Sequence, residues 1–285
     1  MFEILSSLSG TLKKGFFQIP GTIKPLFTEK DMGILELFSL KGRAGYVTGS
    51  ASGIGRSIAK GLTEAGARVA IVDIDFEKAQ KTAQDLVANG CDCLAIHADV
   101  TKKRQIQDIV NKVLERWGRL DIVVNNAGKC LNVPAEEMTE EQWKDGIDLN
   151  LKAVFLSSQA AGKVMIKQRS GSIVNIASMS GLIVNYPQPQ VSYNASKAGV
   201  IMMTKSMAAE WAQYGVRVNS ISPGYTDTDL LKPGKDLHPI WKDRTPMKRF
   251  AEPEEMQGAA IYLASEASRF VTGCNLVVDG GYTLW

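Results

Sequence analysis

From residue 44 onward, the sequence alternates short apolar runs with longer stretches of helical periodicity. The apolar runs cover residues 44–48, 68–73, 93–97, 120–124, 172–177, 217–221 and 276–278. Most are continuously apolar, which is typical of strands buried on both faces of a parallel sheet. The sequence therefore predicts an α/β fold: a single Rossmann-type, doubly wound parallel sheet of about seven strands with helices on both faces.

Two other segments stand apart from this pattern. Residues 1–38 combine glycine, proline and phenylalanine without regular periodicity, and we expect an N-terminal extension before a domain at residues 39–285. A second irregular segment, punctuated by glycine and proline, includes residues 226–250, where we expect a mobile lid over the substrate. Trp241 and His238 lie in this lid, and His238 is expected to be a lid contact rather than a catalyst.

Composition excludes several classes of function. The net charge is +3, and Lys and Arg are dispersed, so nucleic acid is not an expected partner. Four cysteines without metal-ligand spacing and only two histidines predict no metal site. Free thiols are typical of a reducing compartment, and no apolar run is long enough to span a bilayer. We therefore expect a cytoplasmic protein that acts on a small molecule, without a membrane partner.

Gly49, Gly53 and Gly55 lie where the first predicted strand turns into the first predicted helix, with Ser52 and Ile54 between them. Glycine permits a tight turn here and lets the backbone approach a pyrophosphate. The amino end of the following helix offers unpaired N–H groups to phosphate oxygens. This placement predicts a dinucleotide-binding turn, although its spacing is G-x-x-x-G-x-G rather than G-x-G-x-x-G.

Asp73 ends the second predicted strand, where an acidic residue can bind the adenine ribose hydroxyls of a dinucleotide. A carboxylate at this position repels the 2′-phosphate of NADP, and the next residues, Ile74, Asp75 and Phe76, bring no compensating positive charge. The alternative is that Asp73 only caps the next helix. The interpretation we favour is NAD rather than NADP.

Tyr193 and Lys197 are four residues apart in a predicted helix and therefore share one face. A phenol is a poor base at neutral pH, but a nearby ammonium favours the phenolate and lowers the phenol pKa. Such a pair can exchange a proton with a substrate oxygen. The same spacing also arises by chance on surface helices, so the pair alone decides nothing.

Taken in order, these motifs resemble the short-chain dehydrogenase/reductase family over residues 40–285. The matching cofactor motifs are Thr48 to Gly55, Asp99-Val100, Asn125-Asn126-Ala127-Gly128, and Pro223-Gly224 followed by Thr228. The resemblance implies that Asp99 and Val100 contact the adenine and that Asn126, Ala127 and Gly128 lie beneath the cofactor. It also implies that Pro223, Gly224 and Thr228 hold the nicotinamide end.

The resemblance extends to the family's catalytic tetrad, which matches Asn150, Ser178, Tyr193 and Lys197. It implies that Tyr193 is the general acid/base and that Ser178 binds the substrate oxygen. Lys197 would lower the tyrosine pKa and bind the nicotinamide ribose, and Asn150 would hold a water of the proton relay. The implied activity is an NAD(P)-dependent oxidoreductase that interconverts a secondary alcohol and a ketone, and family members usually form homotetramers.

The run from Pro187 to Gln190, together with residues 38–42, is most similar to the sugar and polyol branch, such as sorbose reductases, mannitol dehydrogenases and gluconate 5-dehydrogenases. Asn185 and Gln188, with Ser178 and Tyr193, are therefore candidate substrate contacts. Gln190 and Asn194 are further polar residues near them. Sorbose reductase-like members generally resemble NADP users, whereas Asp73 favours NAD.

Two other functions stay open at this point. A 3-oxoacyl or hydroxysteroid substrate shares every motif and requires an apolar cleft, for which Leu182, Ile183, Val184, Leu230 and Leu231 are available. A non-catalytic dinucleotide-binding scaffold is the alternative from another class. The intact tetrad argues against a scaffold, because a protein that only binds the cofactor needs no base.

Overall fold

The computed structural model describes residues 33–285 of the chain. Residues 34–285 form one compact unit. Nearly all of the predicted N-terminal extension, residues 1–32, lies outside the described residues, so its boundary and role stay predictions.

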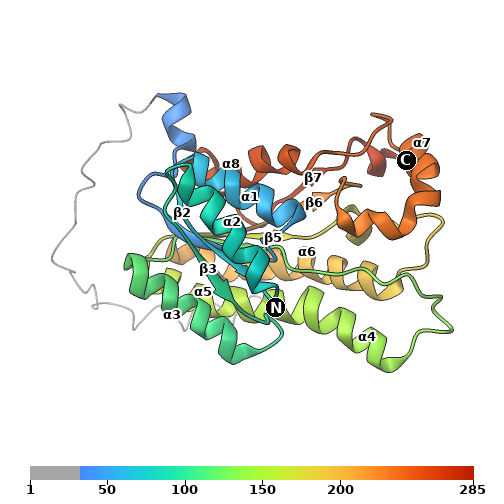
Figure 1. The fold of residues 1–285 in the computed structure, drawn as a ribbon, viewed down its shortest axis with the longest axis horizontal. Helices are drawn as coiled ribbons and strands as arrows, with labels where there is room; N and C mark the ends of the chain where they lie inside the picture. Colours follow the sequence, from blue (N-terminus) through green and yellow to red (C-terminus); the bar gives the residue numbers. More distant parts are fainter. Residues whose placement is uncertain (1–32) are drawn as a thin grey trace, which may run out of the picture. The chain divides into compact units, whose positions relative to one another are not determined.

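A seven-stranded sheet in the order β3-β2-β1-β4-β5-β6-β7 forms the centre of this unit (Figure 1). Every neighbouring pair is parallel. The strands are β1 (Ala44–Thr48), β2 (Arg68–Asp73), β3 (Cys93–His97), β4 (Ile122–Asn125), β5 (Gly171–Ile176), β6 (Val216–Pro223) and β7 (Asn275–Val278). The predicted fold is confirmed, because long apolar runs with helical crossovers pair in parallel and are buried on both faces.

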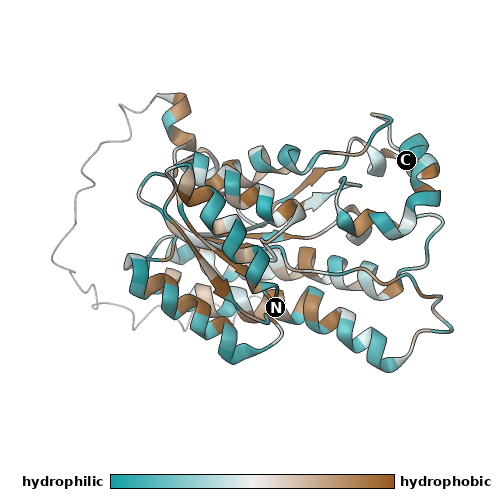
Figure 2. Ribbon diagram, viewed as in Figure 1, coloured by the Kyte–Doolittle hydropathy of each residue, from teal (hydrophilic) through white to brown (hydrophobic). Residues whose placement is uncertain are grey.

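Helices cover both faces of the sheet. The main ones are α1 (Gly53–Glu64), α2 (Phe76–Ala88), α3 (Lys103–Trp117), α4 (Glu140–Ile147), α5 (Ala153–Gln168), α6 (Val191–Trp211), α7 (His238–Arg244) and α8 (Gln257–Ala264). Buried residues of α3, α5 and α6 form one core with the sheet, and those of α1, α2 and α8 form the other. In Figure 2 the strands are mostly apolar, and the helices are apolar on one side and polar on the other.

Two predicted segments are more structured than expected. The long helical periodicity over residues 140–167 corresponds to α4 and α5, with a π-helical turn, η2 (Asp148–Lys152), between them. The stretch expected as a loop before residue 253 contains a 3-10 helix, η5 (Asp229–Leu237), followed by α7. Single π-turns inside helices are frequent at functional sites, and this one carries Asn150.

The strand order reverses between β1 and β4, because successive strands run outward from β1 in one direction and from β4 in the other. Ligands of open α/β sheets bind in the crevice beyond the carboxyl ends of strands at such a switch point. Across the described residues, no helix is long and apolar enough to cross a membrane.

Candidate active site

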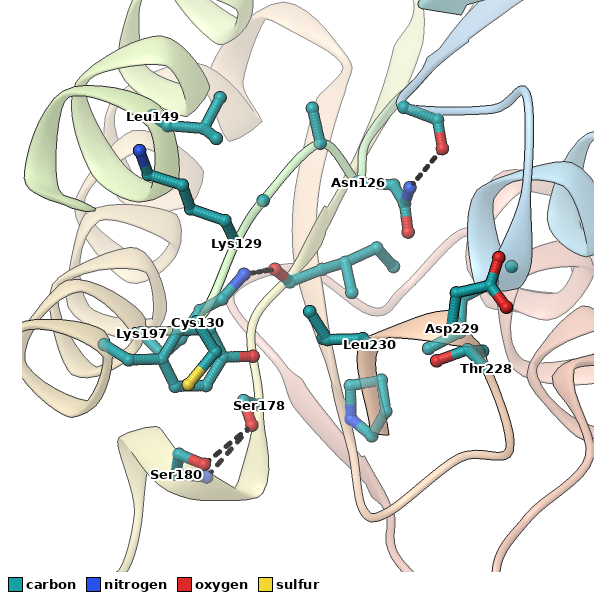
Figure 3. Close-up of a pocket in the computed structure, with 18 of the residues that line it drawn as sticks. Asn126, Lys129, Cys130, Leu149, Ser178, Ser180, Lys197, Thr228, Asp229 and Leu230 are labelled. Carbon is teal, nitrogen blue, oxygen red and sulfur yellow. Dashed lines mark hydrogen bonds between the residues drawn. The ribbon is translucent and has the colours of Figure 1, made fainter. Parts of the chain in front are cut away.

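A pocket of about 880 Å³ opens beyond the carboxyl ends of the central strands (Figure 3). It brings together all but two of the predicted site residues. Those lining it are Gly49, Ser52, Gly53, Ile54, Asp73, Asp99, Val100, Asn126, Ala127, Gly128, Ser178, Asn185, Gln188, Tyr193, Lys197, Pro223, Gly224 and Thr228. Residues from Gly49 to Trp241 therefore share one cavity.

Two predicted residues, Gly55 and Asn150, do not line the pocket, but they fix backbone segments that do. A Cβ on Gly55 would lie 2.2 Å from the carbonyl oxygen of Gly49, so only glycine lets α1 begin this close to the turn. Asn150 is 1% exposed. Its amide accepts a hydrogen bond from the Lys129 N–H at 2.9 Å and donates one to the Lys129 carbonyl at 2.8 Å. The Asn150 side chain therefore holds the loop after β4.

The loops after β1 and β4 are tied to each other at the cofactor end of the pocket. The Asn126 amide donates to the carbonyl oxygens of Thr48 and Gly49, at 3.0 and 2.8 Å. The Thr48 hydroxyl accepts from the N–H groups of Asn126 and Ala127. Gly49 has φ +62°, and a Cβ there would lie 2.8 Å from Ala127 Cα. This cradle and the amino end of α1 fit the pyrophosphate of a dinucleotide.

Asp73 lies at the end of β2, and its carboxylate is held in place by the backbone. One oxygen accepts from the Ala51 N–H and the other from the Asp75 N–H, both at 3.0 Å. The cap of α2 is a different residue, Asp75, which accepts from the Lys78 N–H. Asp73 therefore lines the pocket as a fixed carboxylate rather than as the cap of the next helix.

The predicted proton-transfer residues come from two adjacent elements. Ser178 follows β5, and α6 places Tyr193 and Lys197 one turn apart. The Lys197 ammonium lies 5.5 Å from the centre of the Tyr193 ring and donates to the Ile176 carbonyl at 2.8 Å. Figure 3 shows Ser178, Cys130 and Lys197 on one side of the pocket, with Thr228 to Leu230 opposite.

Burial perturbs both members of this pair. It raises the pKa of the Tyr193 phenol, and the nearby Cys130 thiol raises this pKa further. A hydrogen bond with Ser178 lowers it. Burial also lowers the pKa of Lys197 to about 8. Loss of solvation on burial is the largest cause of the pKa shift at both groups. The lowering of the Tyr193 pKa by Lys197 stays a prediction.

Cys130 is a pocket residue that the sequence analysis did not identify. Its thiol donates to Gln190 at 3.5 Å, and burial raises its pKa to about 11. The thiol is therefore neutral at physiological pH and acts as a small, weakly polar wall residue. Its position two residues after Gly128, in the loop beneath the predicted cofactor site, was the available signal.

A group of buried or half-buried neutral side chains, which we call the amide wall, lines the pocket beyond Ser178. Its members are Asn185, Gln188, Gln190, Tyr225 and Trp241. The Gln190 amide donates to the Ser180 hydroxyl and to Asn185 Oδ1, and the Ser178 hydroxyl donates to Ser180 at 3.1 Å. The wall is thereby connected to Ser178.

The other half of the amide wall joins the pocket to residues 226–250, the predicted lid. The Tyr225 hydroxyl accepts from Gln188 at 2.7 Å and from Asn185 at 3.2 Å. The Trp241 indole N–H donates to Gln188 Oε1 at 3.1 Å, and the Trp241 and Tyr225 rings stack with centroids 4.4 Å apart. Tyr225 was not identified from the sequence, although it directly follows Gly224.

The candidate apolar residues are divided between the pocket and the surface. Leu230 and Leu231 line the pocket, whereas Leu182 and Val184 are exposed side chains outside it. His238 lies in the lid, where its ring contacts Trp241 and Phe250. Among residues 33–285, no group of three His, Cys, Asp or Glu side chains is placed to hold a metal ion.

Comparisons with known proteins show which proteins this chain is similar to. A family model described as enoyl-(acyl carrier protein) reductase matches residues 49–283. The chain is 41% identical to sorbose reductase of Candida albicans over 254 residues, covering 88% of this chain and 90% of that protein. It is 39% identical to NADP-dependent mannitol dehydrogenase of Alternaria alternata, covering 90% and 98% respectively. A short-chain type dehydrogenase/reductase structure from Mycobacterium marinum matches with a TM-score of 0.87 and 40% identity, covering 88% of this chain and 99% of that one.

Proposed function

Because the chain belongs to the short-chain dehydrogenase/reductase family, we propose that its pocket interconverts a polyol and the corresponding keto sugar with a nicotinamide dinucleotide. The observation that carries this proposal is the position of Tyr193, Lys197 and Ser178 beside the glycine cradle, in one pocket with the amide wall. The relatives described above include a sorbose reductase and a mannitol dehydrogenase, which supports a polyhydroxylated substrate.

Each residue near the reacting carbon has a separate role in the proposal. Ser178 binds the substrate oxygen, and Tyr193 accepts its proton during oxidation and returns it during reduction. Lys197, fixed by the Ile176 carbonyl, provides positive charge beside the phenol and binds the nicotinamide ribose. When bound, the nicotinamide exchanges the hydride with the substrate carbon. Asn150 fixes the Lys129 backbone, which keeps the loop after β4 in place under the cofactor.

We propose NAD as the preferred cofactor, with NADP as the alternative that the NADP-dependent relative represents. The fixed carboxylate of Asp73 is placed to bind ribose hydroxyls and to repel a 2′-phosphate. No arginine occurs among the described residues that line the pocket. Arg56, which follows the glycine turn, pairs with Asp85, and Lys78, which follows Asp73, pairs with Asp75.

The expected assembly and location also remain proposals. We infer a cytoplasmic homotetramer, as the family resemblance implies. Exposed apolar side chains on three neighbouring helices, Trp143 on α4, Phe155 on α5 and Met202 on α6, support association through these helices. Light scattering on the purified protein should give four times the 31.0 kDa chain mass. A monomeric mass at all working concentrations would contradict the tetramer.

The experiment that tests the proposed function is a panel of polyols, keto sugars, 3-oxoacyl compounds and hydroxysteroids, each assayed with NAD(H) and NADP(H). Nicotinamide absorbance at 340 nm reports turnover. The proposal predicts the highest kcat/KM for a polyol or keto sugar. A preference for a steroid or acyl substrate would support the apolar alternative, and cofactor binding without turnover of any compound would support the scaffold.

A further inference from the structure

We propose that the amide wall makes the pocket selective for an uncharged polyhydroxylated chain, so that it discriminates against the corresponding sugar acid. This inference rests on the proposed function of the same pocket and narrows its substrate class. The relevant difference is whether the end of the substrate away from the reacting carbon carries a hydroxymethyl group or a carboxylate.

Every member of the amide wall with an amide or indole group is buried and neutral. Asn185, Gln188, Gln190 and Trp241 are 4%, 7%, 6% and 3% exposed. Their side-chain hydrogen bonds run to one another, to Tyr225 and to other neutral groups such as Ser180 and Cys130. A substrate that reaches this wall therefore meets neutral donors and acceptors rather than a compensating charge.

Trp241 determines which Gln188 atom in the amide wall donates hydrogen bonds and which accepts them. An indole N–H can only donate, so the Gln188 atom that faces it is the carbonyl oxygen. The Gln188 NH₂ group then points to the Tyr225 hydroxyl. Because ring stacking between Trp241 and Tyr225 fixes both partners, the wall is preorganised to bind hydroxyl groups.

Most basic groups in or beside the pocket are engaged elsewhere, and the remaining lysine of the lining, Lys102, lies in the loop after β3, where its charge acts on Asp99. Arg244 on α7 is an exposed residue that covers the ring of Tyr186, outside the pocket lining. Lys129 pairs with Asp145, and Lys144 pairs with Asp148. Lys197 is directed to the Ile176 carbonyl, beside the reacting centre. A carboxylate at the amide wall would thus lie against buried dipoles without a cation of its own.

Binding of a sugar acid at the amide wall therefore costs more free energy than binding of the neutral sugar. A buried carboxylate without a paired cation loses far more solvation free energy than a hydroxyl group, which neutral amides can satisfy. Discrimination of at least about 100-fold in kcat/KM is the size of effect that an uncompensated charge produces. A neutral polyol avoids this penalty.

L-Sorbose and 5-keto-D-gluconate form a suitable pair of probes, because they differ only in a hydroxymethyl group against a carboxylate at the far end. Reduction of each by NADH, followed at 340 nm, should give a kcat/KM for L-sorbose that is at least about 100-fold higher. Equal use of both probes, or preference for the acid, would overturn the inference while leaving the proposed function intact. Reduction of neither keto sugar, nor of other neutral ketoses, would overturn both.

The variant Gln188→Met removes the amide while keeping a similar volume. We expect kcat/KM for L-sorbose to fall about 10- to 100-fold, with little change in NADH affinity measured by fluorescence. The ratio of kcat/KM for L-sorbose to that for 5-keto-D-gluconate should also fall, because L-sorbose loses a hydrogen-bond partner. The matched control is Gln107→Met, an exposed glutamine on α3, which should change neither quantity. Equal loss of NADH affinity in Gln188→Met would show that Gln188 only supports the fold and would overturn its assignment.

Discussion

Burial favours the neutral forms of both Tyr193 and Lys197, since it raises the phenol pKa and lowers that of the ammonium. Tyr193, the residue proposed to exchange the substrate proton, is therefore held as a phenol in the protein on its own. The exchange depends on the hydroxyl group itself rather than on the shape of the aromatic ring.

Substitution Tyr193→Phe removes that hydroxyl and keeps the ring. We expect kcat to fall by about 10²- to 10⁴-fold, the usual contribution of a positioned acid or base. NADH affinity should stay close to that of the unmodified enzyme, because the ring still packs on α6. Stopped-flow turnover and fluorescence titration measure the two quantities separately. Loss of both together would contradict the role assigned to the phenol.

The pH dependence follows from the direction of the Tyr193 shift. Alcohol oxidation needs the phenolate to accept a proton, and a raised pKa keeps that form scarce at neutral pH. Oxidation kcat/KM should therefore rise from neutral to alkaline pH, whereas ketone reduction, which uses the phenol, should change little over the same range. Lys197→Met removes a positive charge and should displace the rise to higher pH, and Lys197→Arg should displace it less. A flat oxidation profile would contradict this assignment.

Asp73 carries the proposed cofactor preference. Asp73→Ala removes the charge that repels a 2′-phosphate, so the ratio of kcat/KM for NAD over NADP should fall by about 10-fold or more. The matched control is Asp75→Ala, which removes the cap of α2 and should lower the melting temperature without changing the ratio. An unchanged ratio in Asp73→Ala would show that Asp73 does not face the ribose.

At the scale of elements, the turn that carries Ser178 packs directly on the helix that carries Tyr193. This turn is η3 (Met179–Gly181). A Cβ on Gly181 would lie 2.7 Å from the Lys197 carbonyl carbon, which is backbone and cannot rotate away. Gly181 therefore sets the distance between Ser178 and α6.

Gly181→Ala should separate these two elements and misplace Ser178. We expect a decrease in kcat of about 10- to 100-fold, because small displacements at a reacting centre are costly. Gly258→Ala in α8 is the matched control, since nothing lies within 4 Å of its added Cβ. It should keep activity and stabilise the fold by about 0.5–1 kcal/mol. Kinetics and thermal unfolding test both variants, and wild-type kcat in Gly181→Ala would show that the contact does not position Ser178.

Element order could be predicted because it depends on local periodicity, and β1 and β3 begin and end where the apolar runs predicted. The π-turn at Asp148–Lys152 could not, because its sequence has ordinary helical character. The helices η5 and α7, within residues 226–250, were not predicted either. Pro233 and Gly234 suggested a loop, but η5 accommodates both at a local kink.

At the scale of the whole molecule, the sequence located the cofactor end of the site better than the substrate end. The glycine turn and Asp73 are local signals at strand ends. The amide wall depends instead on contacts between residues far apart in the chain, such as Gln188 with Trp241 and Tyr225. No spacing rule predicts such pairs, so the contacts of Tyr225 with Gln188 and Trp241 became visible only in the folded protein.

The central claim is that this pocket moves a hydride between nicotinamide and the carbon of a neutral polyhydroxylated substrate. The most direct test is to reduce L-sorbose with NADH that carries deuterium at both C4 positions and to analyse the hexitol by mass spectrometry. The account predicts one deuterium per product molecule, bonded to the former carbonyl carbon. Hexitol without deuterium, or no reduction of any neutral keto sugar by enzyme that binds NADH, would contradict it.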